Sequence, residues 1–552
     1  MTFLSPTHLA IACSAAAAAA AACAPSADAF LVRPQLAVRR TTNHRGHAAA
    51  PFSPRFCPGR MPMPYRAVRE DTAAVPEGMV VASKRDELNT KKFLEEMGKN
   101  LSTLNAGTSQ TDEHEPTNDG EGLAECVDIV RDLNGRPLPV QYFAEALDVD
   151  DAVAYTCPES EAFRGLMSNA CRVRLIPGGQ TAFYKRIIFE NLDHAKEKLK
   201  SAPYKLISDS KSYEVVAAFL SSKACQMVSE EAGVRIPKCL DARLEPNKAN
   251  PIESKFSFLL EDLPPSDGWY QRWLLQDMKE CEAALTTLAK IHAYFWNGSS
   301  FWNDADAARE LEEGVWESSD YVQMKRNPTH CAMVAKKWET ERLKCKEELS
   351  GFDYWDNLGS RLEAVAVDVG LRAHPFADDA LSESYQKYRT YCHGDPKQAN
   401  FLIRHGPAPD SEIQLGLIDF QWAGFGLAAC DVAHYMTSAV HADRLVDGGE
   451  DVLLRYYYDE LQKYLVEFGA FPNANAAIQN YSYSTFMEQY DTGFLDICRF
   501  VIAYAWSRFE PVEDDDEEGR IRTMNKNSYN KSVPNAVWLM TRCDEILKSR
   551  GA

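Results

Sequence analysis

Several features are scarce or missing in this chain of 552 residues, and each absence excludes a class of protein. Basic residues are outnumbered, because 60 Lys and Arg stand against 80 Asp and Glu, which leaves a net charge of −20. Nucleic-acid binding needs a basic face, so this balance argues against a nucleic acid as partner. After residue 30 there is no run of 18 apolar residues. The mature chain is therefore expected to contain no membrane-spanning helix.

Cysteine motifs are missing as well. The 15 cysteines are scattered, and they form neither C-x-x-C pairs nor any other metal-ligand spacing. Thirteen of them follow Phe30, and many lie in apolar runs, as Cys171 and Cys430 do. An odd number of dispersed cysteines predicts reduced thiols in a core, which favours a stroma-like or cytosolic compartment over the cell exterior.

Acidic residues are absent from the region Phe30–Arg69, which carries eight Arg and several Pro. That composition is typical of a transit peptide. Before it, Leu9–Cys23 is an alanine-dominated apolar run, followed by Ala27 and Ala29 in the spacing of a signal-peptidase site. The run is too short and too rich in Ala for a convincing membrane span.

These two segments predict a signal-like segment at 1–29 and a transit-like disordered segment at 30–75. Together they resemble the bipartite plastid presequence of algae with secondary plastids, so a plastid is the expected location. The alternative is a plain secretory signal followed by a disordered linker, which would place the protein outside the cell or in the endomembrane system. We expect a helical extension and an acidic linker at 76–122.

The remainder of the chain has the pattern of an α+β protein with two lobes, a small β-rich lobe at 123–263 and a larger helical lobe at 264–552. Apolar runs at 170–176 and 181–189 flank the turn residues P-G-G-Q and predict a hairpin. A helical stretch is expected around 212–228, and an apolar strand at 255–263.

A second hairpin is predicted inside the helical lobe, where "HGDPKQANFLI" and "QLGLIDF" flank a Gly/Pro turn. Asp395 precedes the first strand and Asp419 ends the second, so the hairpin should return one acid to the other, with Asn400 between them. Two carboxylates and an amide suit Mg²⁺, which prefers oxygen ligands. One carboxylate remains to orient a hydroxyl group towards a transferring phosphoryl group.

Such chemistry also needs a strand lysine for the nucleotide phosphates and a helix glutamate that orients this lysine. Lys185 in "TAFYKRIIF" is the candidate lysine, with Arg186 beside it as a competitor. Glu214 in "SYEVVAAFL" is the candidate glutamate, and its rivals are Glu190, Glu197 and Glu230.

The motifs "HGDPKQANFL" and "LGLIDFQWAGFGLAACDVAHYM" resemble those of the aminoglycoside phosphotransferase and choline kinase superfamily. The forms "IDFQ", "LLEDL" and "LAKIHAYFW" are most similar to its ecdysteroid kinase-like branch, over roughly residues 140–545. The resemblance implies a two-lobed protein-kinase-like fold that uses ATP and Mg²⁺. It also implies a set of roles: Asp395 as catalytic acid, Asn400 and Asp419 as metal ligands, Ser168 and Asn169 in the phosphate loop, and Glu261, Asp262 and Leu263 as the hinge that meets adenine.

The chain departs from protein kinases in ways that argue for a small-molecule substrate. It has no G-x-G-x-x-G loop, Gly394 stands where those enzymes carry the Arg of H-R-D, and Gln421 stands where they carry the Gly of D-F-G. We therefore expect an ATP- and Mg²⁺-dependent phosphotransferase that acts on a hydroxyl group of a metabolite, as a monomer or a homodimer. The alternatives are a pseudokinase or nucleotide-binding scaffold and, less favoured, a protein kinase.

The remaining polar residues of these motifs are interpreted as structural: His292 in the core, His393 bracing the loop and Asp431 accepting hydrogen bonds. The acceptor is not specified by the sequence. The segment 300–390 is helical and carries Trp302, Trp316, Trp338, Tyr354 and Trp355, which suit either a cationic acceptor or a steroid-like alcohol, although most such rings fill a core.

Overall fold

The computed structural model describes residues 129–157, 162–164, 168–201, 203–408, 411–513, 515–523 and 532–552. The predicted segments 1–29, 30–75 and 76–122 lie outside these residues. Within the described part of the chain, no helix has the length and apolarity needed to span a membrane. The eleven cysteines in that part are all free thiols, and all except Cys239 are buried. This matches the expectation of reduced core cysteines.

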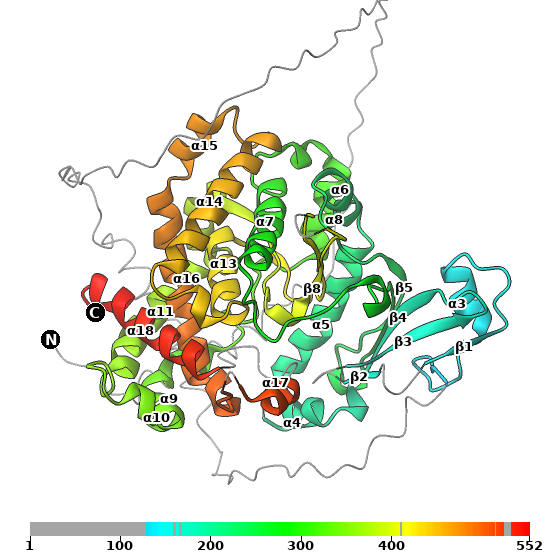
Figure 1. The fold of residues 1–552 in the computed structure, drawn as a ribbon, viewed down its shortest axis with the longest axis horizontal. Helices are drawn as coiled ribbons and strands as arrows, with labels where there is room; N and C mark the ends of the chain where they lie inside the picture. The colour runs from blue at the N-terminus through cyan, green and yellow to red at the C-terminus, as the bar shows by residue number, and fades with distance from the viewer. Residues whose placement is uncertain are drawn as a thin grey trace, which may run out of the picture. The chain divides into compact units, whose positions relative to one another are not determined.

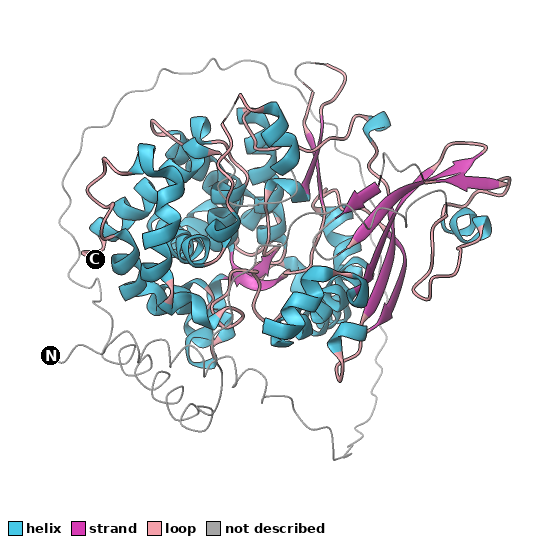
Figure 2. Ribbon diagram, turned by 90° about the horizontal axis from the view of Figure 1, so that it is seen from below, coloured by secondary structure: helices cyan, strands magenta, loops and turns pink. Residues whose placement is uncertain are grey.

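The first part of the fold is an antiparallel sheet, in which the strands lie in the order β1-β3-β4-β6-β5 and β2 pairs with β3 (Figures 1 and 2). Its strands are β1 Ala154–Thr156, β2 Ala162–Arg164, β3 Asn169–Ile176, β4 Thr181–Ile188, β5 Cys239–Glu245 and β6 Lys255–Glu261. The predicted hairpin is the pair β3–β4, with Arg174 opposite Thr181. The predicted strand at 255–263 is β6, which ends at the hinge.

Four helices accompany this sheet: α3 Val140–Ala146, α4 Asp193–Ser201, α5 Pro203–Leu220 and α6 Lys223–Glu231. The single helical stretch expected around 212–228 is in fact two helices. The break follows from Ser222, whose backbone is extended and whose side chain accepts a hydrogen bond from the Cys225 amide, so that it caps α6.

The second part of the fold is mostly helical. Its helices are α7 Met278–Tyr294, α8 Ala305–Gly314, α9 Val334–Glu341, α10 Lys346–Leu349, α11 Leu358–Ala373, α12 Asp379–Tyr385, α13 Ala428–Ser438, α14 Gly449–Glu467, α15 Ala474–Asn480, α16 Tyr483–Ala503, α17 Glu517–Thr523 and α18 Val533–Ser549. Helix α7 buries the predicted apolar face, with Leu285, Leu288 and Ala289 inside. The α+β fold class predicted from the sequence is confirmed.

Two short antiparallel pairs interrupt the helices. The predicted hairpin is β8 Phe401–Arg404 with β9 Gln414–Leu417. The other pair, β7 Arg389–Cys392 with β10 Gly424–Leu427, was not expected, because the sequence after Asp419 favours a chain that runs directly into a helix. Together the two pairs fix both ends of the loop 393–400, which we call the catalytic loop because it carries the predicted catalytic residue Asp395.

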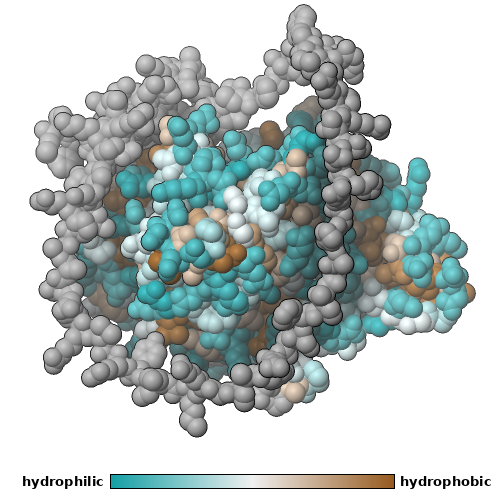
Figure 3. Space-filling model, turned by 90° about the horizontal axis from the view of Figure 1, so that it is seen from above, coloured by the Kyte–Doolittle hydropathy of each residue, from teal (hydrophilic) through white to brown (hydrophobic). Residues whose placement is uncertain are grey.

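The largest buried apolar cluster runs through the helical part and includes residues of α7, α13, α14 and α16. Smaller clusters lie beneath the sheet. On the face shown in Figure 3 the described surface is mostly hydrophilic, with apolar residues in small groups. The rigid helical core therefore supports the loops that carry the candidate site residues.

Candidate active site

The loop 393–400 joins β7 to β8, and the predicted hairpin returns the chain before Asp419 to this loop. Phe401 pairs with Leu417 at the base of the hairpin, which returns the chain to the loop. The Ile418 amide donates to the Asn400 carbonyl oxygen at 3.0 Å. The Asn400 side chain in turn donates through Nδ2 to the Asp395 carbonyl oxygen at 2.7 Å. Asp395, Asn400 and the segment leading to Asp419 are thus held as one unit.

Gly394 explains why this loop reads H-G-D. Its φ is +76°, and a Cβ atom there would lie 2.1 Å from the Trp422 carbonyl oxygen, so only glycine fits. The buried Asp431 fastens the loop from below, because its carboxylate accepts hydrogen bonds from the amides of His393 at 2.8 Å and Gly394 at 2.9 Å. His292 Nε2 lies 3.1 Å from the same carboxylate. These contacts support the structural interpretation of His292, His393 and Asp431.

Asp395 is buried, yet it is held as a carboxylate. Lys397 Nζ donates to its Oδ2 at 2.6 Å, and His434 Nε2 lies 3.5 Å from its Oδ1. Burial alone would raise the pKa of Asp395, but the charges of Lys397 and His434 lower it to about 2. The side chain is therefore ionised throughout the physiological pH range.

Asp419 has an uncommon backbone conformation and a lysine as its charge partner. Its φ is +67°, an uncommon conformation for a residue with a side chain and one that persists only where the surroundings impose it. Lys185 Nζ lies 3.3 Å from its Oδ1. This ion pair joins the strand lysine of the sheet to the loop after β9, as the predicted nucleotide site requires.

The two residues predicted to bind metal, Asn400 and Asp419, each have a side-chain oxygen that is available to a cation. Among the described residues, none donates a hydrogen bond to Asn400 Oδ1 or to Asp419 Oδ2. An amide oxygen and a carboxylate oxygen are suitable ligands for a hard cation such as Mg²⁺. The donor set present here therefore fits the predicted metal.

Glu214 lies on α5 as expected, but within the described chain no hydrogen bond or ion pair joins it to Lys185. The ring of its neighbour Tyr213 does face Lys185, with 5.9 Å between Lys185 Nζ and the ring centre. The role predicted for Glu214 stays a prediction.

Ser168 and Asn169 lie where a phosphate loop should be. Asn169 is the first residue of β3, opposite Arg186, and the next residue, Ala170, is opposite Lys185. Residues 165–167, which precede them, are outside the described residues. Asn169 thus begins the strand next to β4, which carries the lysine that would hold the nucleotide phosphates. The role predicted for Ser168 and Asn169 stays a prediction.

At the predicted hinge the side chains of Glu261 and Asp262 are paired with arginines, and the Glu261 amide donates to the Lys238 carbonyl oxygen at 2.8 Å. Arg235 binds the Glu261 carboxylate through two hydrogen bonds of 2.9 and 2.7 Å. Arg172 Nε pairs with Asp262 Oδ2 at 2.5 Å, and both side chains are buried. Leu263 is buried against Gly416 of β9. This arrangement is compatible with adenine recognition by main-chain groups, as the resemblance implied.

The segment 316–326, which we call the wall segment, lies against the catalytic loop. The Tyr321 amide donates to the Gly394 carbonyl oxygen at 3.1 Å, and the Asp320 amide donates to that of Trp422 at 3.0 Å. The rings of Trp316 and Trp422 stack with centroids 5.9 Å apart. By contrast, two other aromatic residues of the segment 300–390 are core residues: Trp338 packs on Trp506, and Tyr354 is buried.

Arg326 places a cation over the aromatic rings of the wall segment. Its guanidinium lies 4.2 Å from the centre of the Trp316 ring and 5.2 Å from that of Trp422. It donates to the carbonyl oxygens of Ser318 and Asp320. No carboxylate of the described chain pairs with it, and burial lowers its pKa to about 9. It remains a cation at neutral pH.

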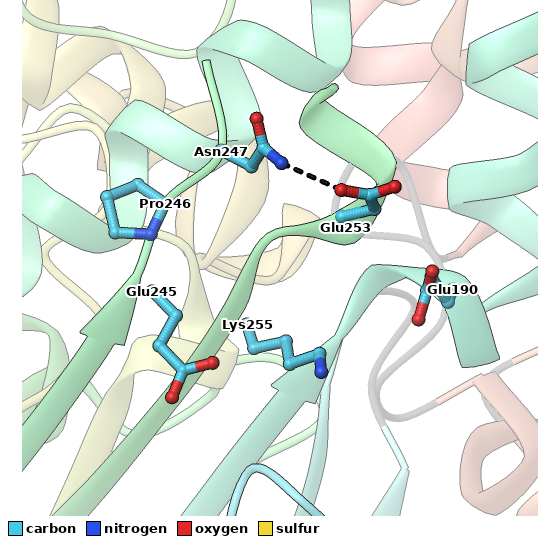
Figure 4. A pocket seen from close by; sticks show the side chains of 6 residues that line it. All are labelled: Glu190, Glu245, Pro246, Asn247, Glu253 and Lys255. Carbon is cyan, nitrogen blue, oxygen red and sulfur yellow. Dashed lines mark hydrogen bonds between the residues drawn. The ribbon is translucent and has the colours of Figure 1, made fainter. Parts of the chain in front are cut away.

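A separate polar hollow lies at the far end of the sheet (Figure 4). It is lined by Glu190, Glu245, Pro246, Asn247, Glu253 and Lys255. Because Lys255 begins β6 and the hinge follows its end, the hollow is a whole strand away from the predicted adenine site. Its three glutamates are also unsuited to phosphate groups. Glu190, a rival candidate for the partner of Lys185, lines this hollow, and within the described chain no hydrogen bond or ion pair joins it to Lys185.

Lys397 and His434 contact Asp395, and Asp320 contacts His434, yet none of the three was predicted as a site residue. Lys397 could have been found, since it lies two positions after Asp395 in the same loop. Asp320 and His434 could not, because each comes from a distant segment and only the fold brings His434 between the two acids.

Comparison with known proteins agrees with the resemblance noted in the motifs. The Ecdysteroid kinase-like family model matches residues 214–470, which confirms the predicted family resemblance for this part of the chain. No curated protein sequence matches the chain.

Three solved structures are similar at low identity. An ethanolamine kinase from Plasmodium vivax is 11% identical, with 74% of this chain and 87% of that chain covered and a TM-score of 0.33. The aminoglycoside phosphotransferase APH(4)-Ia is 13% identical, with coverages of 75% and 98% and a TM-score of 0.27. An amicoumacin kinase in complex with AMP-PNP, Ca²⁺ and Ami is 9% identical, with coverages of 71% and 89% and a TM-score of 0.31.

Proposed function

We propose that this chain, whose residues 214–470 match the Ecdysteroid kinase-like family, is an ATP- and Mg²⁺-dependent phosphotransferase that acts on a hydroxyl group of a small molecule. The observation that carries the proposal is that an ion pair from the sheet lies beside the loop that holds the candidate catalytic carboxylate. Lys185 of the sheet pairs with Asp419, while Asp395 and Asn400 lie in one hydrogen-bonded loop beside it. Phosphoryl transfer needs little more than such positioning and charge neutralisation.

Each of these residues has a separate task in the proposed reaction. The main chain of Glu261–Leu263 binds adenine, and Lys185 binds the phosphates of ATP. Asn400 and Asp419 hold Mg²⁺, which when bound neutralises charge on the phosphates. Asp395 accepts a hydrogen bond from the acceptor hydroxyl and so directs its oxygen at the terminal phosphorus atom. The low pKa of Asp395, about 2, suits orientation of the hydroxyl better than early proton removal.

The wall segment narrows the acceptor class. A cationic acceptor would have to stack on Trp316 and Trp422, where the Arg326 guanidinium already lies. Two cations at one aromatic face repel each other, particularly away from water. We therefore favour a neutral or anionic alcohol over the cationic acceptor that the aromatic residues alone allowed.

The second candidate is a nucleotide-binding protein without turnover. It is favoured because no hydrogen bond or ion pair of the described residues joins Glu214 to Lys185. It is also favoured because the predicted phosphate loop at Ser168 and Asn169 contains a single glycine. A radiometric assay with pools of small alcohols and with generic protein substrates separates the candidates. Label on a small alcohol supports the proposal, label on protein supports a protein kinase, and nucleotide binding without any labelled product supports the scaffold.

A further inference from the structure

His434 on α13 lies between two acids that come from different segments of the chain. Its Nε2 is 3.5 Å from Asp395 Oδ1, and its Nδ1 is 3.3 Å from Asp320 Oδ1. The ring is completely buried, so no water replaces these contacts. Both ring nitrogens therefore lie within ion-pair distance of a carboxylate oxygen, and the contact at Nδ1 is an ion pair rather than a hydrogen bond. Attraction from two carboxylates favours the doubly protonated imidazolium.

Asp320 is itself fixed in place. It has a φ of +83°, its amide donates to the Trp422 carbonyl oxygen, and its Oδ1 accepts from the Val322 amide at 2.9 Å. This carboxylate has a backbone role, yet its buried charge is paired by a side chain only at His434 within the described residues. Asp320 and the His434 imidazolium thus neutralise each other, because burying an unpaired charge costs free energy.

The charges that face His434 are those two acids, and their effect on it is clear. Burial would lower the pKa of His434, but Asp320 and Asp395 raise it to about 9. Beyond Asp395 lies Lys397, and one helical turn before His434 the carboxylate of Asp431 is directed away, towards His292 and the loop amides. The imidazolium is thus the stable form at neutral pH.

The two oxygens of Asp395 have different partners. Oδ2 accepts a hydrogen bond from Lys397 Nζ at 2.6 Å, and Asn400 Nδ2 lies 3.5 Å from it, so both of its partners come from the same loop. His434 instead approaches Oδ1 from the buried helix α13. Without His434, Oδ1 would lose the contact that fixes the rotation of the carboxylate relative to this helix.

We propose that His434 is a positioning residue, whose ring, held by Asp320 of the wall segment, keeps the Asp395 carboxylate correctly oriented for phosphoryl transfer. The inference rests on the proposed function and adds to it a link between the acceptor side of the site and the catalytic carboxylate. The contact through Asp320 means that the wall segment and Asp395 cannot move independently.

The charge state of His434 can be measured without any substrate. In the full chain labelled with ¹⁵N-histidine, the ring signals of His434 are assigned by their loss in His434→Gln. We expect the ring to be doubly protonated at about pH 8, above the ordinary histidine range. Asp320→Asn and Asp395→Asn should each lower its pKa. A neutral ring at that pH, or a ring that responds to neither substitution, would overturn the proposal.

Kinetics test the positioning role. His434→Gln should lower kcat by about 10- to 100-fold, as expected for a misplaced catalytic group, with KM for ATP within about twofold of wild type. The matched control is His441→Gln, because His441 is also completely buried and its Nδ1 lies 3.6 Å from a carboxylate oxygen, that of Asp443. An equal loss of kcat in both variants, or no loss in His434→Gln, would contradict the inference.

The two proposals fail in different ways. If the wild-type chain transfers phosphoryl groups to no acceptor, the proposed function is wrong, while the histidine titration still decides whether the Asp320–His434–Asp395 linkage exists. If wild type is active and His434→Gln is as active as wild type, the proposed function stands and the positioning role is wrong.

Discussion

At the scale of single residues, the proposed reaction depends most on Asp395. Replacing it by Asn keeps the shape of the side chain and removes its charge. We expect phosphoryl transfer to fall by at least about 100-fold, since the acceptor hydroxyl loses its partner, while affinity for ATP stays within a few-fold. Acceptor-dependent ADP release and calorimetric titration with nucleotide measure the two quantities. Turnover near that of wild type would remove Asp395 from the catalytic role.

The two proposed metal ligands, Asp419 and Asn400, differ in charge. Asp419→Ala should weaken Mg²⁺-dependent nucleotide binding more than Asn400→Ala does, because a carboxylate brings a formal charge to the cation and an amide brings only a dipole. Loss of Asp419 also leaves Lys185 without its partner at 3.3 Å. Calorimetry with Mg²⁺-ATP on both variants checks the order, and equal or reversed losses would speak against these metal roles.

The sequence predicted the residues of the site that lie in short motifs and missed those brought in from far away. Asp395, Asn400 and Asp419 flank one hairpin, so local spacing sufficed to place them together. The glutamate partner of Lys185 depends on how α5 packs, and among the described residues no hydrogen bond or ion pair joins Glu214 to Lys185. His434 resembles any other polar position in a buried helix until Asp320 is placed against it.

At the scale of elements, the hairpins were predictable and the short strand pair β7–β10 was not. Alternating apolar residues around Gly/Pro turns indicate β3–β4 and β8–β9. Strand β10 is four residues with two glycines, Gly424–Leu427, and its pairing with β7 is set by tertiary contacts. The end of helix α5 was missed for a similar reason, since Ser222 looks like an ordinary interior residue until it is seen to cap α6.

The catalytic loop gives a prediction at this scale. Gly394→Ala places a Cβ atom against the Trp422 carbonyl oxygen, whereas at Gly298, with φ of +90°, a Cβ atom would meet nothing within 4 Å. Gly298→Ala should cost about 1–2 kcal/mol for the backbone conformation alone, and Gly394→Ala about 1–3 kcal/mol more for the clash. Denaturant unfolding compares them, and equal losses would mean that the close approach at Gly394 is unimportant.

At the scale of the whole molecule, the location of the protein is a proposal that rests on the N-terminal segments. Residues 1–75 fused to a fluorescent protein should enter the plastid of an alga with secondary plastids, with a cut after Ala29. Secretion of the fusion, or its retention in the cytosol, would show that the plastid proposal is wrong.

Since residues 1–75 are not expected to belong to the catalytic lobes, a chain starting near residue 80 should fold and keep its activity.

The most direct measurement is acceptor-dependent ADP release by the purified full chain, with Mg²⁺-ATP and a metabolite library that contains neutral, anionic and cationic alcohols. The proposed function predicts that at least one neutral or anionic alcohol gives ADP together with its phosphate ester, and that Asp395→Asn gives neither above background. Nucleotide binding with no product from any alcohol would contradict it, and so would equal product from wild type and Asp395→Asn.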